Sequence, residues 1–222
     1  MKSKGIAILG ISLLTSWQAY SSSSGARASQ TAAAALKASA LAIGGIPGTG
    51  IAGHYFLTGD FQIVGGYISG SIDIADQISD EGTTYVDKAE ITGTLTTVEA
   101  RYFLGNSFFV AAGLGQRVIS SSSRIESSTT DLYIELDTES TSTVISAALG
   151  NIWSWDSGFF FGFEWIGFTV PIGAEFSTKT TSNIPAGDST FDTISEDTED
   201  LAKNLGESPA PGLLTLNIGF AF

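Results

Sequence analysis

The chain has 222 residues, of which 43% are hydrophobic, 11% aromatic and only 15% charged, and 23 acidic against 10 basic residues give a net charge of −13. It contains no cysteine, which excludes disulfide bonds, thiol chemistry and a lipid anchor on an N-terminal cysteine. Beyond residue 28 no apolar run approaches the ~18 residues of a transmembrane helix. The apolar residues instead occupy short alternating segments, as a membrane barrel requires.

Residues 1–28 have the pattern of an export signal peptide. Lys2 and Lys4 precede the apolar run Gly5–Leu14, which is too short to span a bilayer as a helix. Two pairs of small residues suit the cleavage site, namely Ala19 with Ser21 and Ala26 with Ala28. We therefore expect cleavage between about residues 21 and 28, and a single domain over residues 29–222.

Residues 31–42, TAAAALKASALA, have the composition of a helix, whereas residues 35–45 could also form a strand of small residues. An even number of strands is the rule for single-chain bacterial barrels, and only a strand near residues 35–45 makes the count even. This topological requirement favours the strand.

A hairpin unit then repeats, first as Tyr55–Phe61, then as Tyr102–Phe108, and more loosely as Ser154–Phe159. Three-residue turns at 58–60, 105–107 and 156–158 would pair apolar or aromatic residues across each turn. The same register predicts an apolar outer face made by Ile63, Tyr67, Val98, Tyr102, Val110, Leu114, Ile145, Leu149, Trp153, Phe161, Phe163 and Trp165.

The opposite face of these strands carries the polar residues. The register directs Glu99, Arg101, Arg117 and Glu164 inward, together with His54 and Gln62. Eight strands leave an interior just wide enough for side chains, so we expect the four charges to pair into a network that plugs the lumen. A functional site in the lumen is the alternative.

Three segments, 73–90, 121–141 and 174–210, hold nineteen acidic and four basic residues, a net charge of −15. Their alternation with the short turns predicts long extracellular loops opposite short periplasmic turns. Within the last segment, a capping-box pattern followed by Leu201, Leu205 and Gly206 predicts a short helix over residues 194–205.

The final segment, Pro211–Phe222, alternates large apolar with small or polar residues, which predicts a strand. The closing strand of a soluble β-sandwich is the alternative interpretation. A last strand that ends on phenylalanine resembles the C-terminal signal that the barrel-assembly machinery recognises in bacterial outer-membrane barrels. That resemblance implies an assembly signal formed by Leu214, Leu216, Ile218, Phe220 and Phe222.

The chain as a whole resembles small outer-membrane barrels of the OmpA, OmpX and OmpW type. The features that carry this resemblance are the leader, the repeated aromatic hairpins, and the segments GNSFFVAAGLGQR, GFFFGFEWIGF and the terminal LNIGFAF. The resemblance implies an all-β fold, an eight-stranded antiparallel up-and-down transmembrane β-barrel with short periplasmic turns and long extracellular loops. It also implies the bacterial outer membrane as location, and outer-membrane lipid, lipopolysaccharide and the assembly machinery as partners. We expect no nucleic-acid partner and no cofactor.

The resemblance to small barrels does not specify an activity, because such barrels serve as anchors, adhesins, channels and occasionally lipid-modifying enzymes. His54, the single histidine, is followed by Tyr55 and Phe56, which breaks the histidine and serine motif of barrel lipid A deacylases. No catalytic and no metal-binding residues are therefore predicted. We expect a structural or surface-interaction role, with a narrow channel for small or apolar solutes as the alternative and a lipid-modifying enzyme less favoured.

Overall fold

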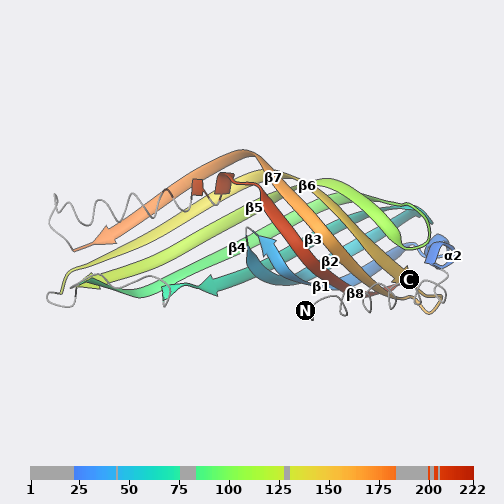
Figure 1. The fold of residues 1–222 in the computed structure, drawn as a ribbon, viewed down its shortest axis with the longest axis horizontal. Helices are drawn as coiled ribbons and strands as arrows, with labels where there is room; N and C mark the ends of the chain where they lie inside the picture. The colour runs from blue at the N-terminus through green and yellow to red at the C-terminus, as the bar shows by residue number, and fades with distance from the viewer. Residues whose placement is uncertain are drawn as a thin grey trace, which may run out of the picture.

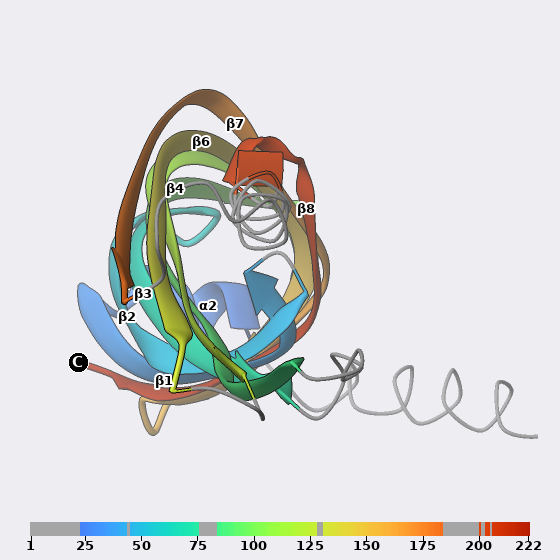
Figure 2. The same ribbon diagram turned by 90° about the vertical axis from the view of Figure 1, so that its left-hand side faces the viewer.

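The computed structural model describes residues 23–43, 45–75, 84–127, 131–183, 200, 203–204 and 206–222. Eight strands follow one another in an up-and-down order and close into a barrel, each strand being antiparallel to its two neighbours (Figures 1 and 2). The predicted fold class is confirmed. Within the described ranges, no helix has the length and apolar content needed to cross a membrane.

The elements whose bounds lie wholly within the described residues are a short helix and eight strands of unequal length. In chain order they are α2 (Ser23–Ala28), β1 (Ala32–Ile43), β2 (Ile46–Thr58), β3 (Phe61–Asp73), β4 (Thr84–Phe103), β5 (Phe108–Ser127), β6 (Tyr133–Ser154), β7 (Phe159–Ser182) and β8 (Ala210–Ala221).

The stretch with helical composition forms β1, as the requirement for an even strand count predicts. β1 pairs with β2 on one side and with β8 on the other, from Ala33↔Ala221 to Leu41↔Leu213. Because these ladders satisfy the backbone of β1 on both sides, closure of the sheet overrides the helix propensity of the alanines.

One end of the barrel carries the three short turns, and we call it the short-turn end. Leu104 N donates to Phe108 O and Trp155 N to Phe159 O, so the turns at 105–107 and 156–158 have the predicted length. The first turn differs, because Thr58 pairs directly with Phe61 and Leu57 is displaced into a bulge. The prediction of a three-residue turn at 58–60 is therefore wrong, although Phe56 still pairs with Gln62 and the register beyond the bulge is unchanged.

The opposite end, which we call the extended end, is formed by the long strands β4 to β7. These strands contain 20, 20, 22 and 24 residues and project well beyond β1, β2, β3 and β8 (Figure 1). Much of the acidic sequence expected to form loops is therefore strand, since the ladders continue to Thr84↔Ser127 and Ile134↔Ser182. In the helix predicted over 194–205, residues 200, 203 and 204 are helical and the others lie outside the described residues.

The outer surface of the barrel is apolar, as predicted. Half or more of the surface of Val98, Tyr102 and Leu114 is exposed, and Tyr67, Ile145 and Leu149 are nearly as open. Ile63, Val110, Phe161, Phe163 and Trp165 on the same face are partly exposed. Trp153 differs, because its ring stacks on Phe161 and only 3% of its surface is exposed.

The lumen is filled by two apolar layers. Near the short-turn end, Val64, Phe103, Phe109, Ile152 and Phe160 pack with small alanines from β1, β2, β5 and β6. Towards the extended end, the tip of the β1–β2 hairpin turns inward. Its residues Ala42, Ile43 and Ile46 pack there against Ile68, Ile91 and Ile119 from three other strands.

Two phenylalanines of the first layer lie directly opposite glycines on the neighbouring strands. Phe109 pairs with Gly150, and Phe160 pairs with Gly219. A Cβ on Gly150 would lie 2.7 Å from the Phe109 ring, and a Cβ on Gly219 would lie 2.5 Å from the Phe160 ring. These glycines therefore provide the space in which the rings lie against the wall.

We predict that Gly150→Ala and Gly219→Ala each lower the stability of the barrel by about 1–3 kcal/mol, because the added methyl overpacks the lumen. Unfolding in detergent, followed by the gel shift between folded and heat-denatured protein, measures the effect. Gly53→Ala is the matched control, since a Cβ there meets nothing within 4 Å. Equal behaviour of the three variants would contradict this packing.

Candidate functional site in the barrel lumen

A buried group of charges lies between the two apolar layers. Arg101 of β4 is fully buried, and its Nη2 donates to Glu99 Oε2 at 3.1 Å and to Glu164 Oε1 at 2.5 Å. Glu164 projects from β7 and also accepts a hydrogen bond from Asn217 Nδ2 of β8 at 3.3 Å. Three of the four charges assigned to the lumen from the sequence thus form one network.

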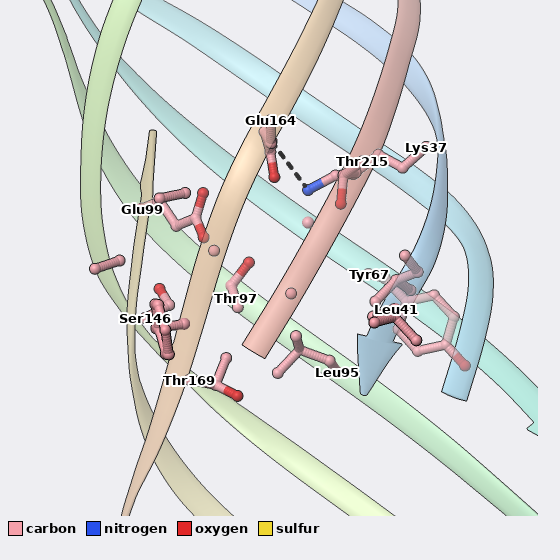
Figure 3. A pocket seen from close by; sticks show the side chains of 18 residues that line it. Lys37, Leu41, Tyr67, Leu95, Thr97, Glu99, Ser146, Glu164, Thr169 and Thr215 are labelled. Carbon is pink, nitrogen blue, oxygen red and sulfur yellow. Dashed lines mark ion pairs between the residues drawn. The ribbon is translucent and has the colours of Figure 1, made fainter. Parts of the chain in front are cut away.

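Lys37 of β1 is a fourth charge in this network, and it is not among the lumen residues predicted from the sequence. Its Nζ lies 3.6 Å from Glu164 Oε1, and the two side chains are each about 10% exposed (Figure 3). The alternation of β1 contains the signal, because Ala33, Ala35 and Ser39 face the lumen and Lys37 has the same parity. The network therefore contains two carboxylates and two cations, and so has no net charge.

Arg117 does not belong to the network, and this part of the prediction is wrong. The side chain is fully buried, but its Nη2 donates to the backbone carbonyls of Gly206 at 2.6 Å and Ser208 at 3.0 Å. No ion pair among the described residues includes Arg117. It points to the segment that leads into β8, where backbone oxygens take the place of a carboxylate. Arg117 therefore anchors this returning segment to the wall of the barrel.

His54 and Gln62 face the lumen, as the register predicts. The His54 ring is 3% exposed, lies 3.2 Å from Gln62 Oε1 through its Nδ1, and contacts Phe160 edge-on at 5.1 Å. Glu99 and Glu164 each accept from Arg101, so both carboxylates have a cationic partner. In the part of the chain that the structure describes, no group of acids and histidine could hold a metal ion.

A small cavity of about 60 Å³ adjoins the network (Figure 3). Its polar wall includes Lys37, Glu99 and Glu164, with Thr97, Ser146, Thr169 and Thr215 (Figure 3). A space of this size with polar groups in part of its wall suits a few water molecules, and is far smaller than the ~300–1,000 Å³ of a small-molecule site. The arrangement is therefore suited to holding paired charges more than to binding a substrate.

The residues of the expected assembly signal lie along β8. Ile218, Phe220 and Phe222 are 42%, 60% and 78% exposed, and Leu216 is partly exposed on the same outer face. Leu214 is also exposed but has a positive φ of 55°, and Leu213 beside it faces outward too. The alternation thus slips by one residue here, which the sequence pattern did not indicate.

No known protein-family model matches the chain, and no curated protein matches its sequence. Among solved structures, it is similar to Acinetobacter baumannii CarO, with 10% identity and a TM-score of 0.45, over 87% of this chain and 98% of the other. It is also similar to A. baumannii CarO2, with 11% identity and a TM-score of 0.48, over 87% of this chain and 99% of the other. Similarity at this level says nothing about function. The chain's own architecture, an eight-stranded up-and-down barrel with an apolar exterior, is that of the small outer-membrane barrels.

We predict that Glu164→Gln and Arg101→Gln each cost about 3–5 kcal/mol, because each leaves buried charges without their partner. The double variant should cost less than the sum of the two, since the second substitution removes the charge that the first one left unpaired. Denaturant unfolding in detergent of the four proteins in this cycle measures the coupling.

Arg117→Gln provides the control for this cycle. Arg117 shares no described contact with Glu164, so its effect should add to that of Glu164→Gln. Strict additivity of Arg101→Gln with Glu164→Gln would contradict the network.

Proposed function

We propose that the protein is an integral barrel of the bacterial outer membrane with a structural and surface-interaction role. The observation that carries the proposal is the inverted distribution of side chains. Leu36, Val98, Leu114 and Phe220 are about 60% or more exposed on the outer face, whereas Arg101 in the lumen is fully buried. A surface of this kind is stable in lipid, where the closed ladder satisfies the backbone.

The filled lumen supports a structural role over transport. The two apolar layers lie on either side of the charge network, and the cavity beside the network holds only about 60 Å³. The interior of an eight-stranded barrel is in general just wide enough for side chains. A channel would require the inturned β1–β2 tip to leave the lumen.

The extended end supports a role in surface interaction. The outer face of the four-stranded extension presents Glu90, Asp137 and Glu139 beside Ser120, Ser122 and Lys179 around a shallow hollow. Adjacent strands place Glu90, Ser122, Asp137 and Lys179 in one cross-strand row. We propose that this polar, mostly acidic face projects from the membrane beside lipopolysaccharide and contacts the surroundings of the cell.

A non-enzymatic role agrees with the surroundings of His54. Its described partners are the Gln62 side chain and the Phe160 ring, and neither can act as a nucleophile or as a general base. The carboxylates of the network are held by Arg101 and Lys37. We therefore propose no reaction for this lumen.

Cell fractionation and planar-bilayer recording together test the proposal. The protein should sediment with outer membranes, run faster on gels before boiling than after it, and give no steady conductance when purified. Recovery in the soluble periplasm would refute the membrane role. A stable conductance that changes in Glu164→Gln would establish the channel instead.

We further predict that Phe222→Ala reduces the amount of assembled barrel more than it reduces the stability of the barrel that does assemble. The Phe222 side chain is 78% exposed, while its backbone is fixed by hydrogen bonds with Thr31 and Ala32 that alanine would keep. Leu36→Ala is the matched control, since Leu36 is 69% exposed on the adjacent β1. Quantifying folded protein in outer membranes compares the two, and equal losses would argue against an assembly signal.

A further inference from the structure

The short helix α2 lies across the short-turn end of the barrel, within the outline of the ring of strands (Figure 2). Ala26 and Arg27 are buried, with 1% and 0% of their surface exposed, whereas Ser24 and Ala28 face outward. The helix therefore has a face that packs into the mouth of the lumen.

Arg27 makes the central contacts of this helix. Its Nε donates to Gly59 O and its Nη1 to Asn106 O, both at 2.8 Å, and its guanidinium lies 3.7 Å from the centre of the Phe103 ring. Burial lowers the pKa of Arg27 to about 10, although Asp60 acts in the opposite direction, so the side chain is charged at neutral pH. Burying a cation is unfavourable unless it is hydrogen-bonded, and the two carbonyls and the ring meet most of that need, while Nη2 has no hydrogen-bond partner among the described residues.

Neighbouring residues extend these contacts to all three short turns. Ser24 N donates to Asn106 Oδ1 at 3.3 Å, and Gln30 Nε2 donates to Trp155 O at 3.3 Å. Gly59, Asn106 and Trp155 belong to the β2–β3, β4–β5 and β6–β7 connections respectively. Residues 24–30 thus join three turns that are far apart in the sequence, and Phe103 links them to the first apolar layer of the lumen.

We propose that export processing cuts the chain after Ser21, and that Ser23–Gln30 remains in the mature protein as a plug that closes the short-turn end. This proposal rests on the outer-membrane function proposed above. In the cut, water hydrolyses the Ser21–Ser22 peptide bond and leaves a carboxylate on Ser21 and an amine on Ser22. Ala19 and Ser21 supply the small residues that such a cut requires.

The alternative cut, after Ala28, would remove the buried Arg27. The carbonyls of Gly59 and Asn106 and one face of Phe103 would then lose their partner at the mouth of the lumen. The contacts of the buried Arg27 can stabilise the mature barrel only if this helix remains in it after processing. The sequence pattern does not distinguish a cut after Ser21 from a cut after Ala28, and the contacts of Arg27 favour the cut after Ser21.

Intact-mass measurement of the full-length protein purified from outer membranes tests the processing step. We expect a mature chain that begins at Ser22. A chain that begins at Ser29 would overturn the proposal and leave the outer-membrane function intact, whereas a protein absent from outer membranes would refute that function itself.

A cross-link tests the position of the plug, because the chain has no cysteine of its own. The pair Ser24→Cys and Asn106→Cys should form a disulfide under mild oxidation in the processed protein, since the backbone of Ser24 contacts the Asn106 side chain. The pair Ser24→Cys and Ser122→Cys should not, because Ser122 lies on the extended end. Failure of the first pair in processed protein, or equal reaction of both pairs, would overturn the plug.

Arg27→Gln provides a third measurement, which tests whether the plug stabilises the mature barrel. The variant should lower the temperature at which the folded band is lost on gels, because a neutral amide cannot replace both the charge and the ring contact. Arg124→Gln is the charge-matched control on the extended end, where Arg124 pairs with Glu126 in a partly exposed position. An unchanged temperature for Arg27→Gln would contradict a stabilising plug.

Discussion

The hydrogen-bonded ladder between β1 and β8 is the constraint on which the rest of the molecule depends. Without it, eight strands would form an open sheet with two edges and an apolar surface on one side. With it, the alanine-rich β1 becomes strand, Lys37 is directed into the lumen, and the chain end at Phe222 is fixed through its backbone to Thr31 and Ala32. Closure thus determines both the shape of the barrel and the content of its interior.

The interior of the barrel contains a buried network of charges between two apolar layers. In this network two cations, Arg101 and Lys37, pair with two carboxylates, Glu99 and Glu164. The first apolar layer lies on its short-turn side and the second apolar layer on its extended side. Such a balanced ionic group need not add stability compared with an apolar core. It does fix which strands face one another across the lumen, because a shift in register would separate the partners.

Period-two alternation allowed much of this arrangement to be predicted from the sequence. It placed Glu99, Arg101 and Glu164 inward, and it would have placed Lys37 there too had the parity of β1 been followed. The bulge at Leu57, the positive φ of Leu214 and the backbone partners of Arg117 could not be predicted, because each depends on how strands or returning segments meet in space. The same holds for α2, whose sequence carries no sign of the three turns that it joins.

The unequal lengths of the strands leave the extended end with a free sheet edge. A closed barrel has no free edge, but the extension does, since β7 pairs with β8 only as far as Thr169 and runs on to Ser182 with no second neighbour among the described residues. In this stretch of β7, Pro171 has no backbone N–H to donate, and Glu175 and Lys179 add charges of both signs. These are the features by which natural edge strands discourage pairing with other chains. The projecting sheet of one copy is therefore not favoured to pair edge to edge with the sheet of another copy.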